Sequence, residues 1–173
     1  MPTVPRRVVT GHDHDGVSVF LQDGPAPVVR TAPDGAFFYE IWGTGATPAP
    51  VSAAEPDPAE RSLTVPPAPG GTKIRINEFP PGVVSPTHRT QSVDFGIVLD
   101  GEIVLVLENN SEATLGPGDV VVQRGTSHRW ENRTERPARM AFVLIDGVFT
   151  EDLLARLDSG VLDGLLHDPM RSD

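Results

Sequence analysis

Short apolar runs, in which hydrophobic and polar positions often alternate, recur along most of the chain. They are bounded by Gly, Pro, Asp and Asn, and helical periodicity is almost absent before residue 150. Short strands separated by such turn residues are typical of a β-sandwich or a β-barrel. The pattern therefore predicts an all-β fold, with strands at residues 6–10, 17–22, 36–42, 73–79, 93–99, 102–108, 119–123 and 140–145.

Two glycine-containing segments predict tight turns between these strands. Asp100-Gly101 stands between two apolar runs. Asp-Gly is a strong hairpin signal, because a type I′ turn needs positive φ at both central residues. We therefore expect a hairpin there, and a second tight turn at Gly116-Pro117-Gly118.

The distribution of prolines divides the chain into parts. Residues 44–71 contain seven prolines and little apolar content, which predicts a long loop. It separates an N-terminal strand extension, residues 1–43, from a strand-rich core at residues 72–147. Because long loops without regular structure are often functional in compact domains, we expect this one to border the mouth of the barrel.

Residues 148–173 have a different pattern and are expected to form short helices and a tail. Thr150, followed by Glu151 and Asp152, fits a helix N-cap with acidic residues in the first turn. Leucine and valine side chains then recur at helical spacing as far as residue 166. This predicts two short helices, packed on the barrel and broken near Gly160.

Composition narrows the chemistry. Asp and Glu outnumber Lys and Arg by 24 to 14, and the basic residues form no stripe, which argues against nucleic acid as a partner. No apolar run is long enough for a membrane span or a signal peptide, so we expect a cytoplasmic protein. The absence of cysteine excludes thiolate catalysis, cysteine-based zinc sites and iron–sulfur clusters.

A candidate site follows from strand periodicity. Residues of equal parity share one face of a strand, so His88, Thr90, Ser92 and Asp94 point the same way if this segment is extended. An imidazole and a carboxylate then share one pocket. His128 follows a later strand, whose register could bring it across to the same place.

These two stretches resemble the two sequence motifs of the cupin family over about residues 72–147. The first motif carries Thr in place of its second histidine and Asp in place of Glu. The second motif is shortened by one residue and carries Gln123 in place of the usual proline. The residues in matching positions are Gly82, His88, Thr90, Asp94 and Gly101, then Gly118, Asp119, Gly125, His128 and Asn132.

The resemblance implies a double-stranded β-helix, also described as a jelly-roll barrel, that is often dimeric. It also implies one divalent transition metal (Fe, Zn, Mn or Ni) bound by His88, Asp94 and His128. Thr90 is a poor ligand, because a neutral hydroxyl binds transition metals weakly. The alternative is a cupin that has lost its metal, in which His88 or His128 acts as a general acid or base.

Neighbouring residues are candidates for substrate binding. Thr90 lies between the proposed ligands, and Trp130 has the same parity as His128 and could form a pocket wall. Arg89 and Arg129 flank the two histidines and could hold a substrate carboxylate. The His12-Asp13-His14-Asp15 segment fits a solvated turn better than a metal site.

For function, our leading hypothesis is a metal-dependent lyase that catalyses decarboxylation or dehydration of a small hydroxylated or carboxylated metabolite. The cupin-like pattern resembles proteins of such pathways, including polyketide metabolism. The alternatives are an Fe(II) dioxygenase or isomerase with the same site, and a non-catalytic cupin that binds a small molecule. We also expect a homodimer that uses the N-terminal strands, because residues 6–10 and 17–22 are more apolar than one small barrel requires.

Overall fold

The computed structural model describes residues 3–53, 57 and 64–166, and strands dominate this part of the chain. Three antiparallel sheets form: a hairpin β1-β2, a three-stranded sheet β10-β7-β8 and a six-stranded sheet β3-β4-β5-β11-β6-β9. The elements are β1 (Arg6–His12), β2 (Ser18–Pro25), β3 (Val28–Thr31), β4 (Phe37–Thr44), β5 (Thr72–Phe79), β6 (Ser92–Asp100), β7 (Ile103–Leu107), β8 (Glu112–Leu115), β9 (Val120–Arg124), β10 (His128–Glu131), β11 (Ala138–Asp146) and α1 (Glu151–Leu154).

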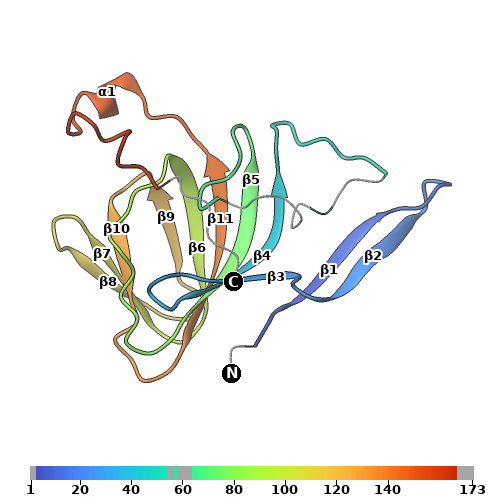
Figure 1. Cartoon of the computed structure of the whole chain (residues 1–173), viewed down its shortest axis with the longest axis horizontal. Coiled ribbons are helices and arrows are strands. Elements are labelled where there is room, and N and C mark those ends of the chain that lie inside the picture. The colour runs from blue at the N-terminus through green and yellow to red at the C-terminus, as the bar shows by residue number, and fades with distance from the viewer. Residues whose placement is uncertain (1–2, 54–56, 58–63, 167–173) are drawn as a thin grey trace.

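The three-stranded and six-stranded sheets pack face to face around one hydrophobic core, as Figure 1 shows. Core side chains come from β5, β6 and β11 on one side and from β7 and β10 on the other. They include Phe79, Met140, Ile103 and Trp130, each at most 3% exposed. The all-β, double-stranded β-helix expected from the sequence is confirmed.

All eight predicted strands are present, and three further strands are not signalled by the pattern. The missed strands are β3, β8 and β10, each only four residues long. β8, with the sequence EATL, is mostly exposed and has no apolar run. β10, with the sequence HRWE, reads as a polar loop although it carries His128.

The predicted hairpin at Asp100-Gly101 is wrong. β6 belongs to the six-stranded sheet and β7 to the three-stranded sheet, so this turn carries the chain from one sheet to the other. Gly101 does have a positive φ of 75°, and a Cβ there would lie 2.5 Å from the carbonyl oxygen of Pro137. The glycine signal therefore marked a tight turn correctly, but not the pairing of its flanking strands. The tight turn at residues 116–118 is confirmed, with the Asp119 amide donating to the Gly116 carbonyl at 3.0 Å.

The N-terminal residues have two positions in the fold. β3 and β4 extend the six-stranded sheet beyond β5, whereas β1 and β2 form a separate hairpin that projects from the barrel (Figure 1). The described start of the long loop follows β4. Its described end, at Thr64 and Val65, returns to the inner side of β5, where Lys73 and Arg75 donate to its carbonyls. Residues 54–56 and 58–63 lie outside the described residues.

The C-terminal segment begins with α1, whose N-cap is Thr150 as predicted. The second predicted helix does not form within the described residues, because residues 159–164 adopt hydrogen-bonded turns with Gly160 at a φ of 95°. A positive φ at Gly160 interrupts helical geometry. Residues 167–173 lie outside the described part. Within that part, no helix has the length and apolar character needed to cross a membrane.

Candidate functional site

His88, which is half-buried, and His128, which is buried on β10, lie directly opposite each other. Their backbones form an isolated antiparallel bridge, with N–O distances of 2.9 and 3.0 Å in the two directions. The centroids of their rings are 4.4 Å apart. Two reciprocal hydrogen bonds between their own backbone groups therefore hold together two histidines that are far apart in the sequence.

Each imidazole is also fixed by a hydrogen bond to its own chain segment. The Nδ1 atom of His88 is 2.9 Å from the Pro86 carbonyl oxygen, and that of His128 is 2.9 Å from the Thr126 carbonyl oxygen. A carbonyl only accepts, so Nδ1 must carry the proton in both rings. Nε2 of each neutral ring therefore keeps its lone pair, which is the arrangement that metal-binding histidines use.

The environment keeps both rings neutral. Burial, together with the nearby His88, lowers the pKa of His128 to about 4. Burial also lowers the pKa of His88, and the charge of Arg75 acts in the same direction. Neutral imidazoles can bind a metal, because ligands must be deprotonated to do so.

Asp94 lies on the inner face of β6 and is 5% exposed. Its direct neighbours across the sheet are Gln123 on β9 and Leu144 on β11. Its Oδ1 atom has no hydrogen-bond partner. Burial raises the pKa of Asp94, partly opposed by Ser92 and by the charge of Arg75. This carboxyl group is therefore disposed to hold or transfer a proton.

The remaining predicted site residues have different positions. Thr90 is buried and accepts a hydrogen bond of 2.8 Å from the Ser92 hydroxyl. Trp130 lies beside His128, with ring centroids 5.9 Å apart in an edge-on arrangement, and its other side packs against Phe142 at 5.5 Å. Trp130 is therefore the part of the hydrophobic core that lies next to the histidine pair.

The two predicted arginines have protein partners. Arg129 has the opposite parity from His128 on β10, and its Nε donates to Glu131 at 2.6 Å. Arg89 donates to the Gly125 carbonyl oxygen at 2.8 Å and lies 3.4 Å from Glu108. Neither arginine is placed by these contacts beside Asp94.

Sequence reasoning missed a set of polar side chains inside the barrel. The sequence predicts a strand at KIRINEF but not which of its faces is inside, and its polar alternate residues are the buried ones. Lys73, Arg75 and Asn77 are at most 6% exposed, and Ile74 and Ile76 lie on the other face. The alternation itself was the available signal, although it does not say which face is inside.

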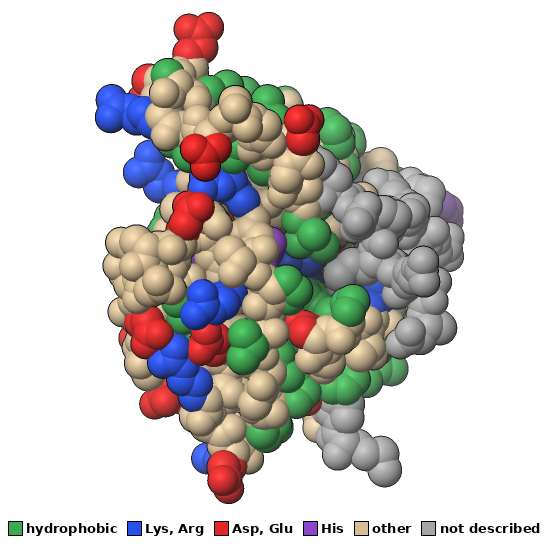
Figure 2. Space-filling view, turned by 60° about the vertical axis from the view of Figure 1, so that its left-hand side comes forward, with side chains coloured by type: hydrophobic (Ala, Val, Ile, Leu, Met, Phe, Trp, Pro, Cys, Tyr) green, Lys and Arg blue, Asp and Glu red, His purple; other side chains and the backbone are tan. Residues whose placement is uncertain are grey.

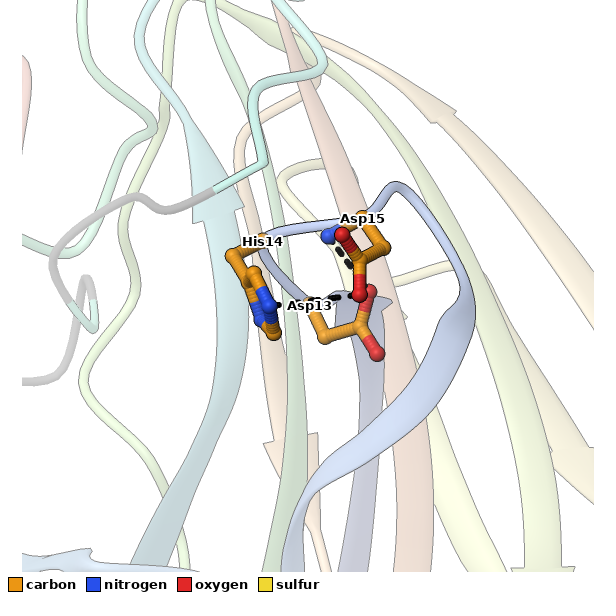
Figure 3. Close-up of side chains that lie close together, drawn as sticks. All are labelled: Asp13, His14 and Asp15. Carbon is orange, nitrogen blue, oxygen red and sulfur yellow. Dashed lines mark hydrogen bonds and ion pairs between the residues drawn. The ribbon is translucent and has the colours of Figure 1, made fainter.

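The His12-to-Asp15 segment forms the tip of the β1-β2 hairpin, shown in Figure 3. Among the described residues, Asp13, His14 and Asp15 are the only group of three His, Asp or Glu with ligand atoms within 4.8 Å of one another. Asp13 accepts hydrogen bonds of 2.9 Å from the backbone amides of Asp15 and Val17. These bonds close the turn, as the interpretation of a solvated turn requires.

Comparisons with known proteins place the chain in a family. A sequence model described as a cupin domain matches residues 75–145. A phomopsin biosynthesis cluster protein, C′, of Diaporthe leptostromiformis is 39% identical over 82% of this chain and 78% of that protein. The cupin-domain-containing oxidoreductase fogC of Aspergillus ruber is 38% identical over 81% of this chain and 71% of that protein. This chain belongs to the cupin family.

A further cupin relative is the cupin-domain-containing oxidoreductase virC of Hypocrea virens. It is 35% identical over 81% of this chain and 75% of its own length. The three alignments cover most of both chains. The similarity thus extends beyond the residues that the cupin-domain sequence model matches.

Cupins commonly bind a divalent metal, and the histidine pair of this cupin fits one. The two Nε2 atoms are unprotonated, so each can offer its lone pair to a metal. Asp94 Oδ1 is a buried carboxyl oxygen without a hydrogen-bond partner. In the described part of the chain, however, Asp94 does not gather with both histidines within 4.8 Å. His88 and His128 are therefore the stronger ligands, and Asp94 is the candidate third donor.

Proposed function

We propose that this cupin is a metal-dependent lyase that removes CO₂ or water from a small hydroxylated or carboxylated metabolite. The proposal rests on one arrangement: two neutral imidazoles with available Nε2 atoms, in the same barrel as a buried carboxyl group whose pKa is raised, with Arg75 acting on both His88 and Asp94. A proton donor next to a site for charge stabilisation is what loss of CO₂ or water requires. The names of two relatives, which refer to phomopsin biosynthesis, support a small metabolite as substrate.

In the proposed mechanism, His88 and His128 would hold a divalent metal, which would supply Lewis-acid stabilisation of negative charge. For decarboxylation, the C–C bond to the carboxylate breaks and its electron pair stays on the substrate as an enolate. Protonated Asp94 gives its proton to the resulting carbanion centre and is reprotonated from water. Trp130 forms an apolar wall beside His128, which limits the access of water to this position.

The second candidate function is oxidation by an Fe(II) enzyme with the same residues. Its support is that several relatives are named cupin-domain-containing oxidoreductases. Two histidines and one carboxylate are a ligand set suited to Fe(II), with positions left for substrate and O₂. Asp94 would then be a ligand rather than a proton donor.

The experiment begins with elemental analysis of protein purified without added metal. Hydroxylated aromatic acids and β-keto acids are then assayed with and without O₂. A lyase is expected to release CO₂ or water equally well under both conditions. His128→Ala should reduce turnover by about 10²–10³-fold, because a group that stabilises developing charge is lost.

The matched control is His14→Ala, which removes an exposed histidine at the hairpin tip and should leave turnover unchanged. O₂ uptake equal to product formation, together with inactivity under anaerobic conditions, would replace the lyase by the oxidative enzyme.

A further inference from the structure

A second group of polar side chains lies inside the barrel, beside the histidine pair but separate from it. We call it the interior polar cluster. It comes from the inner faces of β4, β5 and β9, and each member is at most 6% exposed: Glu40, Lys73, Arg75, Asn77 and Gln123. Polar groups this deeply buried normally have hydrogen-bond partners.

Several atoms of the cluster lack such partners. Arg75 Nε and Gln123 Nε2 are buried donors without an acceptor. Both residues flank Asp94: Gln123 is its cross-strand neighbour, and Arg75 is close enough to lower its pKa. Leaving buried donors unpaired costs stability, so their presence points to a ligand that pairs with them.

The position of Arg75 is fixed by contacts that do not use its Nε. Its guanidinium carbon lies 4.9 Å from the centroid of the Phe38 ring, and Nη1 donates to the Val65 carbonyl oxygen at 3.4 Å. Lys73 provides the ion pair to Glu40, with 3.7 Å between Nζ and Oε2. The guanidinium is thus held from one side while another edge remains available.

The interior polar cluster contains buried cations, although the whole protein carries a net charge of −10. Lys73 and Arg75 are buried here, and Arg30 is close enough to lower the pKa of Lys73. They face two carboxyl groups, Glu40 and Asp94. Lys73 is paired with Glu40, so the Arg75 guanidinium is the cation of the cluster that can meet a ligand, and a single guanidinium suits a monoanion better than a phosphate dianion.

We propose that Arg75 and Gln123 form the substrate-binding position of this cupin and that they bind a carboxylate of a small organic acid. A guanidinium presents two parallel N–H donors that match the two oxygens of a carboxylate, and Gln123 Nε2 adds a third donor. The acid is then anchored beside Asp94. The face in Figure 2 is hollowed at its centre, where a histidine and a basic side chain are visible between apolar side chains.

This inference rests on the proposed lyase for its consequence in the reaction. A guanidinium stabilises the negative charge of a carboxylate, and that charge is lost from a carboxylate that departs as CO₂. Holding the departing group would therefore stabilise the substrate more than the transition state. The carboxylate bound by Arg75 is consequently one that the product retains.

Binding is tested in metal-free protein prepared with a chelator, so that carboxylates cannot bind to a metal. The probes are two matched pairs, salicylate with salicylamide and lactate with lactamide, measured by titration calorimetry. Wild-type protein should bind at least one acid more tightly than its neutral amide. Arg75→Gln should weaken that binding by about 10-fold or more, which corresponds to about 1.4 kcal/mol, and Arg75→Lys should weaken it less.

Arg133→Gln is the charge-matched control, because Arg133 is exposed and pairs with Glu112 and Glu131. It should leave the affinity for the acid unchanged. An acid whose affinity equals that of its amide in both pairs, or is unchanged in Arg75→Gln, overturns the proposal.

Gln123→Met provides a readout that does not depend on the folding of an Arg75 variant. It replaces an amide whose buried Nε2 atom is unpaired by an apolar side chain of similar length. We expect a melting temperature about 2–4 °C higher and weaker binding of the acid. A lower melting temperature with unchanged affinity would show that Gln123 is structural, and would contradict the proposal.

Neither measurement requires turnover. If the protein binds acids through Arg75 but releases no CO₂ or water, the proposed lyase activity is wrong and the proposed binding position stands. If the protein is a lyase but its affinity for acids is unchanged in both Arg75→Gln and Gln123→Met, only the proposed binding position is wrong.

Discussion

At one end of the six-stranded sheet, polar side chains point inward and apolar ones outward, which is the reverse of most antiparallel sheets. Where β5 and β6 begin, the inner face carries buried Lys73, Arg75 and Asp94. On the outer face, Phe95 and Val122 are 36% and 56% exposed. The barrel therefore keeps polar groups inside at a cost in stability, which indicates that they serve binding or chemistry.

The other end of the same interior is conventional. There Phe79, Met140 and Trp130 form an apolar core. One barrel thus has a polar half that contains the candidate site and an apolar half that provides the stability. Replacing a large residue of the apolar half by alanine should lower the free energy of unfolding, whereas replacing a polar residue of the other half by an apolar one should raise it. Exposed apolar residues of the β1-β2 hairpin should instead affect the association of two copies of the chain.

The largest expected effect is in the apolar half. Trp130→Ala should lower the free energy of unfolding by about 3–5 kcal/mol, because it removes a large buried aromatic side chain and leaves a cavity. Urea unfolding followed by circular dichroism measures this loss. Trp42→Ala, at a half-buried tryptophan outside the core, is the control and should cost less. Equal losses for the two variants would contradict the division of the interior into two halves.

The next effect comes from the polar half and depends on pH. Burial lowers the pKa of Lys73 to about 8 from its usual 10.5, so the folded protein releases this proton before the unfolded chain does. Between these values the unfolded state binds more protons, and stability must rise with pH. From pH 8 to pH 10, wild type should gain about 2 kcal/mol relative to Lys73→Met.

Chemical unfolding of both proteins at each pH measures this difference. Comparison with Lys73→Met cancels the contributions of other groups that titrate in this range. A constant difference between the two proteins would show that Lys73 is not buried as a charged group.

The smallest expected effect concerns the exposed apolar surface. Phe20 and Leu21 on the β1-β2 hairpin are 76% and 50% exposed. We propose that the hairpin packs against a second copy of the chain. In a symmetric dimer the same surface of both subunits meets, so the exposed apolar side chains of one copy would cover those of the other. Light scattering at micromolar concentration should give a dimeric mass. Phe20→Ser should weaken the dimer by about 10-fold, or about 1.4 kcal/mol.

Leu162→Ser is the control, since Leu162 is 46% exposed in the C-terminal turns and away from the hairpin strands. A monomeric mass for wild type would rule out the dimer.

The sequence by itself determined the positions of eight strands, of two tight turns and of the two histidine segments. Apolar runs located eight strands because such runs pack well on a sheet. The motif spacing selected His88 and His128, which the structure brings together, and Asp94, which lies in the same interior. These features are local, since they depend on residue type and spacing along one segment.

Only the tertiary structure decided which face of each strand is inside and which segments meet. A period of two defines two faces, but closure of the barrel chooses between them, and it turned Arg75 inward and Ile74 outward. β10 became a strand because β7 pairs with it, although its four residues carry little strand signal. Asp100-Gly101 joined two sheets instead of one hairpin for the same reason: strand partners are chosen by packing across the whole barrel, and no single segment contains that information.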